Sequence, residues 1–235
     1  MSDEELVLRF LDSLWFESGL SVNTQSAYRS DLNRFSRWLL NNQSQGLTKV
    51  SRNTLLLFLE DNLAKGAKST SSARLLSTLR KFYRYMLREG FIDIDPALNI
   101  EHPKPARYLP STLTEDEVER LLQAPEIELP LEHRDAVMLE ILYGSGLRVS
   151  ELVALELHQV NLKQGIVRIR GKGNKDRLVP MGEPAINRYA HYLKHVRPDI
   201  LGLIASNVVF PSLRRQIMTR QTFWHRVKLY ASRCG

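Results

Sequence analysis

Prolines at positions 96, 103, 105 and 110 divide this 235-residue sequence into two parts. Proline cannot continue a helix and favours an extended conformation in the residue before it, so the segment 96–110 is predicted to be extended. Helical patterns lie on both sides of this segment, and a chain of this length can form two hydrophobic cores. We therefore expect a first domain at residues 1–95, a linker at 96–110 and a second domain at 111–235.

The first part carries the pattern of four helices with short polar connections. Serine or an acidic residue stands at the start of each segment that has helical apolar periodicity, as is typical of helix N-termini. The expected starts lie near Glu4, Ser21, Ser51 and Ser69. This pattern predicts a four-helix N-terminal domain.

The fourth predicted helix has one apolar face and one cationic face. At 100° per residue an arc of about 140° holds the apolar side chains of Leu75, Leu76, Leu79, Phe82, Tyr83, Met86 and Leu87. The opposite arc holds Arg74, Arg80, Lys81, Arg84 and Arg88. A solvated basic face is one interpretation. Because no acidic residue lies between Asp61 and Glu89 to pair with these cations along the chain, we interpret the face as a phosphate-binding surface.

Composition indicates a nucleic-acid partner rather than a membrane. The formal net charge is +7, and no acidic residue follows Asp199. No apolar run is long enough to span a bilayer, so we expect a cytoplasmic protein without membrane association. The single cysteine, Cys234, excludes an internal disulfide. His191 and His195 could share a helix face, but a third ligand is lacking, so we expect no metal and no cofactor.

The second part predicts mostly helix with one short antiparallel sheet. Thr114–Glu117 has the form of a capping box, and Thr219 has the form of an N-cap. Arg148 follows a glycine turn and opens an apolar-periodic helix, where unpaired N–H groups favour an anion, and Glu151 lies one turn later. Residues 165–180 alternate apolar and basic residues around a Gly-Lys-Gly-Asn turn, which indicates a hairpin with Lys172 near its tip. Taken separately, a surface ion pair would explain the Arg148 motif equally well, and a lysine in a hairpin turn is usually only solvated.

The two motifs together, in this order, resemble the tyrosine site-specific recombinases of the lambda-integrase family, and most closely the Xer branch. The similarity lies in Gly144-Ser-Gly-Leu-Arg-Val-Ser-Glu-Leu152 and in Arg170-Gly-Lys-Gly-Asn-Lys-Asp-Arg-Leu-Val-Pro180. It continues through Met218-Thr-Arg-Gln-Thr-Phe-Trp-His225 and through the N-terminal half. The resemblance implies a SAM-like core-binding domain of four helices followed by a recombinase catalytic domain.

The resemblance also implies roles for individual residues. Arg148 and Lys172 would be catalytic, with Glu151 orienting Arg148. Contacts to double-stranded DNA at a recombination site are expected from Arg74, Arg80, Lys81, Arg84, Arg88, Arg170, Lys175, Arg177 and Arg220. Members of the family cut and rejoin DNA through a 3′-phosphotyrosyl intermediate without metal or ATP. For the Xer branch this implies chromosome dimer resolution at cell division and a heterotetramer with a paired Xer-type recombinase.

The family's second box, His-x-Leu-Arg-His, and its tyrosine nucleophile are not found before the sequence stops at Gly235. Tyr230 aligns ahead of that box and is expected to be a packing residue. We therefore expect the chain as printed to bind DNA without cleaving it. Three interpretations remain: a recombinase lacking its C-terminal part, a naturally truncated non-catalytic DNA-binding protein, and an unrelated basic helical protein such as a transcriptional regulator.

Overall fold

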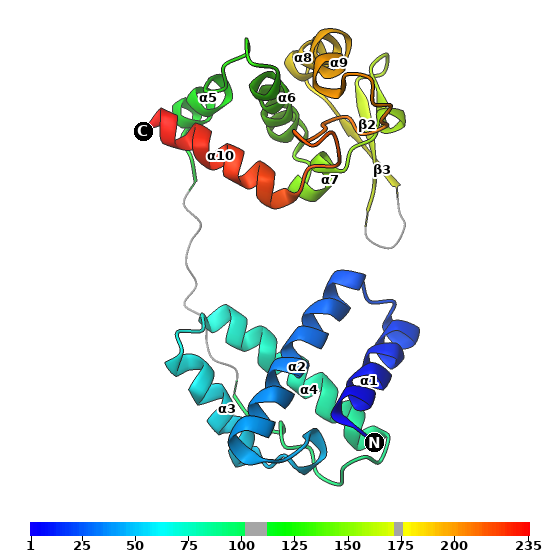
Figure 1. Cartoon of the computed structure of the whole chain (residues 1–235), viewed down its shortest axis with the longest axis vertical. Coiled ribbons are helices and arrows are strands. Elements are labelled where there is room, and N and C mark those ends of the chain that lie inside the picture. The colour runs from blue at the N-terminus through cyan, green and yellow to red at the C-terminus, as the bar shows by residue number, and fades with distance from the viewer. Residues whose placement is uncertain (102–111, 172–175) are drawn as a thin grey trace. The chain divides into compact units, whose positions relative to one another are not determined.

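The computed structural model describes residues 1–101, 112–171 and 176–235. The chain divides into two compact units, Met1–Pro110 and Ser111–Gly235. The described residues are mostly helical, and they include one small antiparallel sheet of three strands (Figure 1). The fold class predicted from the sequence is therefore confirmed.

The described residues of the first unit, 1–101, form four helices and one short 3-10 turn. They are α1 (Asp3–Ser18), α2 (Val22–Gln43), η1 (Leu47–Lys49), α3 (Arg52–Ala64) and α4 (Ser69–Arg88). The Ser21 hydroxyl caps α2 by accepting the backbone N–H of Thr24 at 3.3 Å. The Ser51 hydroxyl caps α3 by accepting the backbone N–H of Thr54 at 3.2 Å. The serines thus mark the helix starts because their oxygens satisfy N–H groups that have no partner within the helix.

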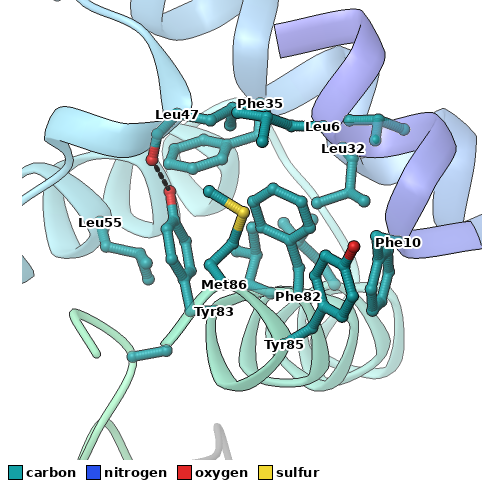
Figure 2. Close-up of a cluster of buried hydrophobic side chains, with 14 of the residues drawn as sticks. Leu6, Phe10, Leu32, Phe35, Leu47, Leu55, Phe82, Tyr83, Tyr85 and Met86 are labelled. Carbon is teal, nitrogen blue, oxygen red and sulfur yellow. Dashed lines mark hydrogen bonds between the residues drawn. The ribbon is translucent and has the colours of Figure 1, made fainter. Parts of the chain in front are cut away.

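Helix α4 supplies the centre of the first core. Phe82, Tyr83 and Met86 are fully buried, and the rings of Phe82 and Phe10 pack edge to face at 5.3 Å between centroids (Figure 2). The buried Tyr83 hydroxyl donates to the Leu47 carbonyl at 3.2 Å. This bond lets a tyrosine occupy the core without an unsatisfied polar atom, and it fixes η1 against α4.

The buried face of α4 is rotated relative to the predicted one. Leu87, expected inside, is 42% exposed, whereas Tyr85 is buried. Tyr85 packs on Phe10 of α1, with 5.5 Å between ring centroids. The helical wheel placed Tyr85 outside the apolar arc because it could not show that α1 covers that side of the helix.

The segment that follows α4 belongs partly to the first core. Ala97 and Ile100 are buried within the same cluster of side chains as Phe82. The first residues of the predicted linker 96–110 therefore pack on the first unit. Residues 102–111, which include most of that linker, lie outside the described residues.

The second unit contains the sheet and the remaining helices. Its elements are α5 (Glu115–Gln123), α6 (Pro130–Ser145), α7 (Val149–Val153), η2 (Leu157–Gln159), β1 (Val160–Asn161), β2 (Ile166–Arg170), β3 (Asp176–Pro180), α8 (Glu183–His191), the π-helical η3 (Tyr192–Val196), α9 (Arg197–Leu201) and α10 (Arg220–Cys234). Helix α5 opens with the predicted capping box, in which Thr114 Oγ1 accepts the Glu117 N–H at 3.3 Å and Glu117 Oε2 accepts the Thr114 N–H at 2.7 Å. Helix α10 opens at Thr219, also as predicted.

The sheet has the strand order β1-β2-β3, and both pairings are antiparallel. In β2 the buried Val167 and Ile169 alternate with the exposed Arg168 and Arg170. Because directly paired residues project to the same face, the register Ile169↔Arg177 puts Arg177 on the core side of β3. The Arg177 side chain therefore points toward the interior of the second unit.

We expect Phe82→Ala to destabilise the first unit by about 3–5 kcal/mol, because it deletes a fully buried ring and leaves a cavity. The matched control, Leu87→Ala on the same helix, removes a partly exposed side chain and is expected to cost less than about 1 kcal/mol. Urea unfolding followed by circular dichroism measures both. Equal losses in the two variants would show that the core is not centred on this face of α4.

Candidate functional site

Arg148 stands between two helices of the second unit. Helix α6 ends at Ser145, and Gly146 caps it with a φ of 60°, a left-handed conformation that glycine adopts without strain. Leu147 is buried, Arg148 is the N-cap of α7, and the Arg148 side chain is 71% exposed. Helix α7 has only five residues, so the predicted contribution of a helix N-terminus to anion binding is small.

The Glu151 carboxylate holds Arg148 in place. Its Oε2 accepts the Arg148 backbone N–H at 2.8 Å, and its Oε1 accepts Nη1 of the same arginine at 3.0 Å. A second arginine, Arg177 of β3, donates Nη1 to Oε1 at 3.0 Å and Nη2 to Oε2 at 2.7 Å. Arg148 and Arg177 thus share the Glu151 carboxylate, and the expected role of Glu151 in orienting Arg148 stays a prediction.

Glu151 remains ionised in this cluster. The Glu151 side chain is only 13% exposed, and burial alone would raise its pKa. The hydrogen bonds from Arg177 and Arg148 outweigh burial, so the pKa of Glu151 lies below its ordinary value. The same carboxylate raises the pKa of Arg177. Two guanidinium groups and one carboxylate therefore leave the cluster with net positive charge at neutral pH.

The other basic residues of the hairpin differ in their positions. Arg170 is 72% exposed on the outer face of β2, where its Nε lies 3.5 Å from Asp176 Oδ1. With Arg168 and His158 it lines an open polar hollow. Lys172 and Lys175 fall in the segment 172–175, which lies outside the described residues. Arg220 is exposed in the first turn of α10, beside an apolar hollow that Val149 of α7 also lines.

The basic face of α4 lies in the first unit, and two of its arginines pair with acids from other helices. Arg74 Nη1 lies 2.5 Å from Oδ2 of Asp31, a buried carboxylate on α2. Arg88 donates both terminal nitrogens to the Glu17 carboxylate of α1, at 3.1 and 2.6 Å. The expectation that these cations lack acidic partners was wrong, because it considered only neighbours along the chain.

The remaining cations of this face are less engaged. Arg80 donates to the Ile100 carbonyl. The Lys81 ammonium lies 5.6 Å from the centroid of the Tyr28 ring. Arg84 is exposed and has no ion-pair partner among the described residues. Lys81 and Arg84 are therefore the cations of α4 that are best placed to meet an external anion.

A charge network that the sequence did not predict joins α6 to α10. The α6–α10 network consists of Glu132, Arg134, Asp135, Arg226, Tyr230 and Arg233. Asp135 Oδ2 accepts Arg226 Nε at 2.6 Å and the Tyr230 hydroxyl at 2.7 Å. Glu132 binds both terminal nitrogens of Arg233, at 2.6 and 3.0 Å. The acids on successive turns of α6 pair with arginines about 90 to 100 residues away in the sequence. The only feature of the sequence that could have indicated this network is that α6 carries charged residues on a face that must be buried.

Tyr230 is a packing residue in this network, as expected. Its ring is fully buried, and its hydroxyl donates to Asp135 while it accepts Arg226 Nη2 at 2.6 Å. Burial, together with the charge of Asp135, raises the pKa of the Tyr230 phenol well above its ordinary value. An uncharged phenol with both hydrogen-bonding roles filled is a poor nucleophile.

The rings of the two histidines noted in the sequence, His191 and His195, lie close together in a tilted arrangement, and His133 stacks on His191. The ring centroids of His191 and His195 lie 4.8 Å apart, and the His133 ring lies 5.3 Å from that of His191. Within residues 1–101, 112–171 and 176–235, no group of three or more His, Cys, Asp or Glu side chains has an arrangement that could hold a metal ion. In the same ranges no helix combines the length and apolar character needed to cross a bilayer.

Comparison with known proteins identifies the family. The family model described as "Phage integrase family" matches residues 111–235, and that described as "Phage integrase, N-terminal SAM-like domain" matches residues 7–90. This chain belongs to the phage integrase family. It is 54% identical over 234 residues to tyrosine recombinase XerD of Shewanella oneidensis, which covers 99% of this chain and 77% of that protein. Identity to XerD of Pseudomonas aeruginosa is 52% over 229 residues, covering 97% and 76% of the two chains.

Solved structures of the phage integrase family share the fold. A lambda integrase tetramer bound to a Holliday junction matches with a TM-score of 0.73 and 20% identity, covering 100% of this chain and 64% of that one. Identity above 50% to two XerD proteins makes the chain XerD-like. It spans about three quarters of the length of these two relatives.

The α6–α10 network predicts acid sensitivity of the second unit. Hydrogen bonds from Arg233, assisted by the Glu126 backbone and Arg226, lower the pKa of Glu132 to about 2. A carboxylate whose pKa is lower in the folded state stabilises the fold above its ordinary pKa, and this contribution is lost as pH falls through the folded value. We expect Glu132 to contribute about 2 kcal/mol that is full above pH 5 and declines between about pH 4.5 and 2.

Urea unfolding from pH 7 to pH 2, compared between the wild type and Glu132→Gln, measures this contribution. The variant should be less stable at pH 7, and its stability should fall less steeply in acid. Glu119→Gln, which changes an exposed acid on α5, serves as the control. If wild type and Glu132→Gln lose stability in parallel below pH 5, the network does not act through the charge of Glu132.

Proposed function

We propose that this chain binds double-stranded DNA as a Xer-type tyrosine recombinase, with Arg148 contacting the phosphate at which strand exchange occurs. The observation that carries the proposal is the exposed Arg148 guanidinium, which donates a hydrogen bond to Glu151. Both residues belong to the first of the two motifs that resemble the family. A guanidinium fixed in this way retains N–H groups that can bind two oxygens of one phosphate. The 54% identity to XerD supports the same interpretation.

The chemistry proposed for the site follows from its cations. Arg148 would neutralise charge on the non-bridging phosphate oxygens, and this charge grows as a nucleophile approaches. Lys172, at the second shared motif, would donate a proton to the 5′ oxygen that leaves. In a protein carrying the nucleophile, the 3′-phosphotyrosyl bond would preserve the energy of the phosphodiester, so rejoining would require no ATP. These roles remain those that the resemblance implied.

We further propose that the 235 residues bind DNA without cleaving it. This proposal is supported by Tyr230, whose buried hydroxyl is fixed by Asp135 and Arg226. The chain would then occupy a recombination site and hold the phosphate without attacking it.

For the XerD-like protein as a whole, we propose a role in chromosome dimer resolution and segregation at cell division. Its partner there would be a second Xer-type recombinase in a heterotetramer on two recombination sites. The likeness to XerD supports this role, and the tetramer named for lambda integrase is a property of that protein.

We also propose that the first unit contacts DNA through α4, chiefly through Lys81 and Arg84. Arg74 would be a poor choice for testing this surface, because its removal leaves the buried Asp31 carboxylate without its ion pair. Arg88 is likewise engaged by Glu17. Arginine in an ion pair can still approach a phosphate, but its mutation would change the fold and the contact together.

The first test is binding to a duplex that carries a Xer recombination site, measured by fluorescence anisotropy at several salt concentrations. The logarithm of affinity should fall linearly with the logarithm of salt concentration, by about 0.9 per phosphate contact. Arg148→Ala should weaken binding about tenfold and reduce that slope by about one. Lys163→Ala, in the turn between β1 and β2 at the far end of β2 from the hairpin tip, is the matched control.

The outcome that contradicts the DNA proposal is an affinity that does not change with salt. The same reactions, denatured and separated by mass, test the absence of cleavage. Any covalent protein–DNA species formed by the wild type would contradict the proposal that these residues do not cleave. Its loss in Tyr143→Phe, a change at an exposed tyrosine of α6, would identify that tyrosine as the nucleophile.

The second test concerns α4. The double variant Lys81→Ala/Arg84→Ala should weaken binding to specific and scrambled duplexes to a similar degree, and it should lower the salt slope by about two, because phosphate contacts carry no sequence information. Lys49→Ala is the control, since η1 packs on the apolar side of α4 through the Tyr83–Leu47 bond. Unchanged affinity in the double variant would show that α4 does not face DNA.

A further inference from the structure

Arg177 was expected to contact DNA, but its surroundings are those of an internal partner. It lies on the core side of β3, directly opposite the buried Ile169. Its side chain is 38% exposed, about half the value of Arg148 or of Arg170 on the outer face of the sheet. Both of its terminal nitrogens are already bound to Glu151.

The four hydrogen bonds on Glu151 form a complete set. Each carboxylate oxygen accepts one bond from Arg148 and one from Arg177, at distances from 2.7 to 3.0 Å. The planar fork of Arg177 matches the two oxygens at once, which a lysine ammonium cannot do. With the fork in place, the carboxylate cannot rotate without breaking two bonds, so the bonds it makes to Arg148 keep their direction.

We propose that Arg177 is a positioning residue, whose guanidinium fork fixes the Glu151 carboxylate and through it orients Arg148 toward the DNA phosphate. This inference rests on the proposed phosphate contact of Arg148. It also gives β3, the strand that follows Lys172 in the sequence, a direct link to α7. The Glu151 carboxylate belongs to the first of the two motifs that resemble the family, and Arg177, 26 residues later, belongs to the second. The ion pair between them therefore joins the two motifs.

A double-mutant cycle on DNA affinity separates a positioning role from a phosphate contact. Arg177→Gln should weaken binding about tenfold in the wild-type background, the loss expected of a charge-assisted hydrogen bond. In the Arg148→Ala background the same change should have little further effect, because the residue through which it acts is gone. An equal loss in both backgrounds would make Arg177 a direct DNA contact and would overturn the proposal.

Two further variants sharpen the cycle. Arg177→Lys retains the charge but loses the fork, so it should not restore affinity; full restoration would show that charge alone matters and would also overturn the proposal. Arg170→Gln on the outer face of the sheet is the matched control, and its loss should add to that of Arg148→Ala. Circular dichroism and the melting temperature establish that each variant folds.

A DNA-independent measurement distinguishes failure of this inference from failure of the proposed function. The rate of rotation of the Arg148 guanidinium, measured by nitrogen NMR of the free protein, should be slow in the wild type and increase in Arg177→Gln and Arg177→Lys. If wild type fails to bind DNA, the proposed function is wrong, while faster rotation still supports the positioning role. Unchanged rotation in both variants would overturn it.

Discussion

A carboxylate removed from water must be paired, and this requirement organises both units of the protein. Asp31 in the first unit is paired with Arg74, and Asp135 and Glu132 in the second are paired with arginines of α10. Glu151 is shared between Arg148 and Arg177. In each case an arginine from a distant segment satisfies an acid on a helix, so the ion pair also fixes how the two segments pack.

The effect of these ion pairs on packing is clearest at α7. A helix of five residues is not stable by itself, because its few hydrogen bonds do not offset the conformational entropy lost when the first turn forms. Leu152 and Val153 bury its inner side, and Glu151 ties its outer side to β3. The exposed Arg148 therefore stands on a segment whose conformation is set entirely by its neighbours. Such support is what a phosphate-binding side chain requires, since a misplaced guanidinium loses its bidentate geometry.

Local features of the sequence predicted the fold well, and contacts between distant segments limited the prediction of the site. Ser21, Ser51, Thr114 and Thr219 marked helix starts because capping is a matter of three or four residues. The partners of Arg74, Arg88 and Arg177 lie 43, 71 and 26 residues away. No periodicity along the chain encodes those distances, so the sequence could not predict that these arginines pair with acids of distant segments.

The two faces of β3 illustrate the same limit. Leu178 and Val179 are both apolar, so alternation alone could not say which side of the strand faces the core. The register places Val179 and Arg177 on the inner side, and Leu178 is 62% exposed. Had the register of the hairpin been known, it would have placed Arg177 on the core side of β3 in advance.

The choice of arginine rather than lysine in these pairs has a chemical consequence. In the described residues the pairs that involve Asp31, Glu132, Asp135 and Glu151 all use arginine. Guanidinium stays charged across the physiological pH range and is not a target of the acetylation that neutralises lysine. Acetylation of surface lysines such as Lys81 would therefore weaken attraction to a polyanion while leaving the internal scaffold intact. The internal ion pairs and the surface lysines thus differ in their sensitivity to this modification.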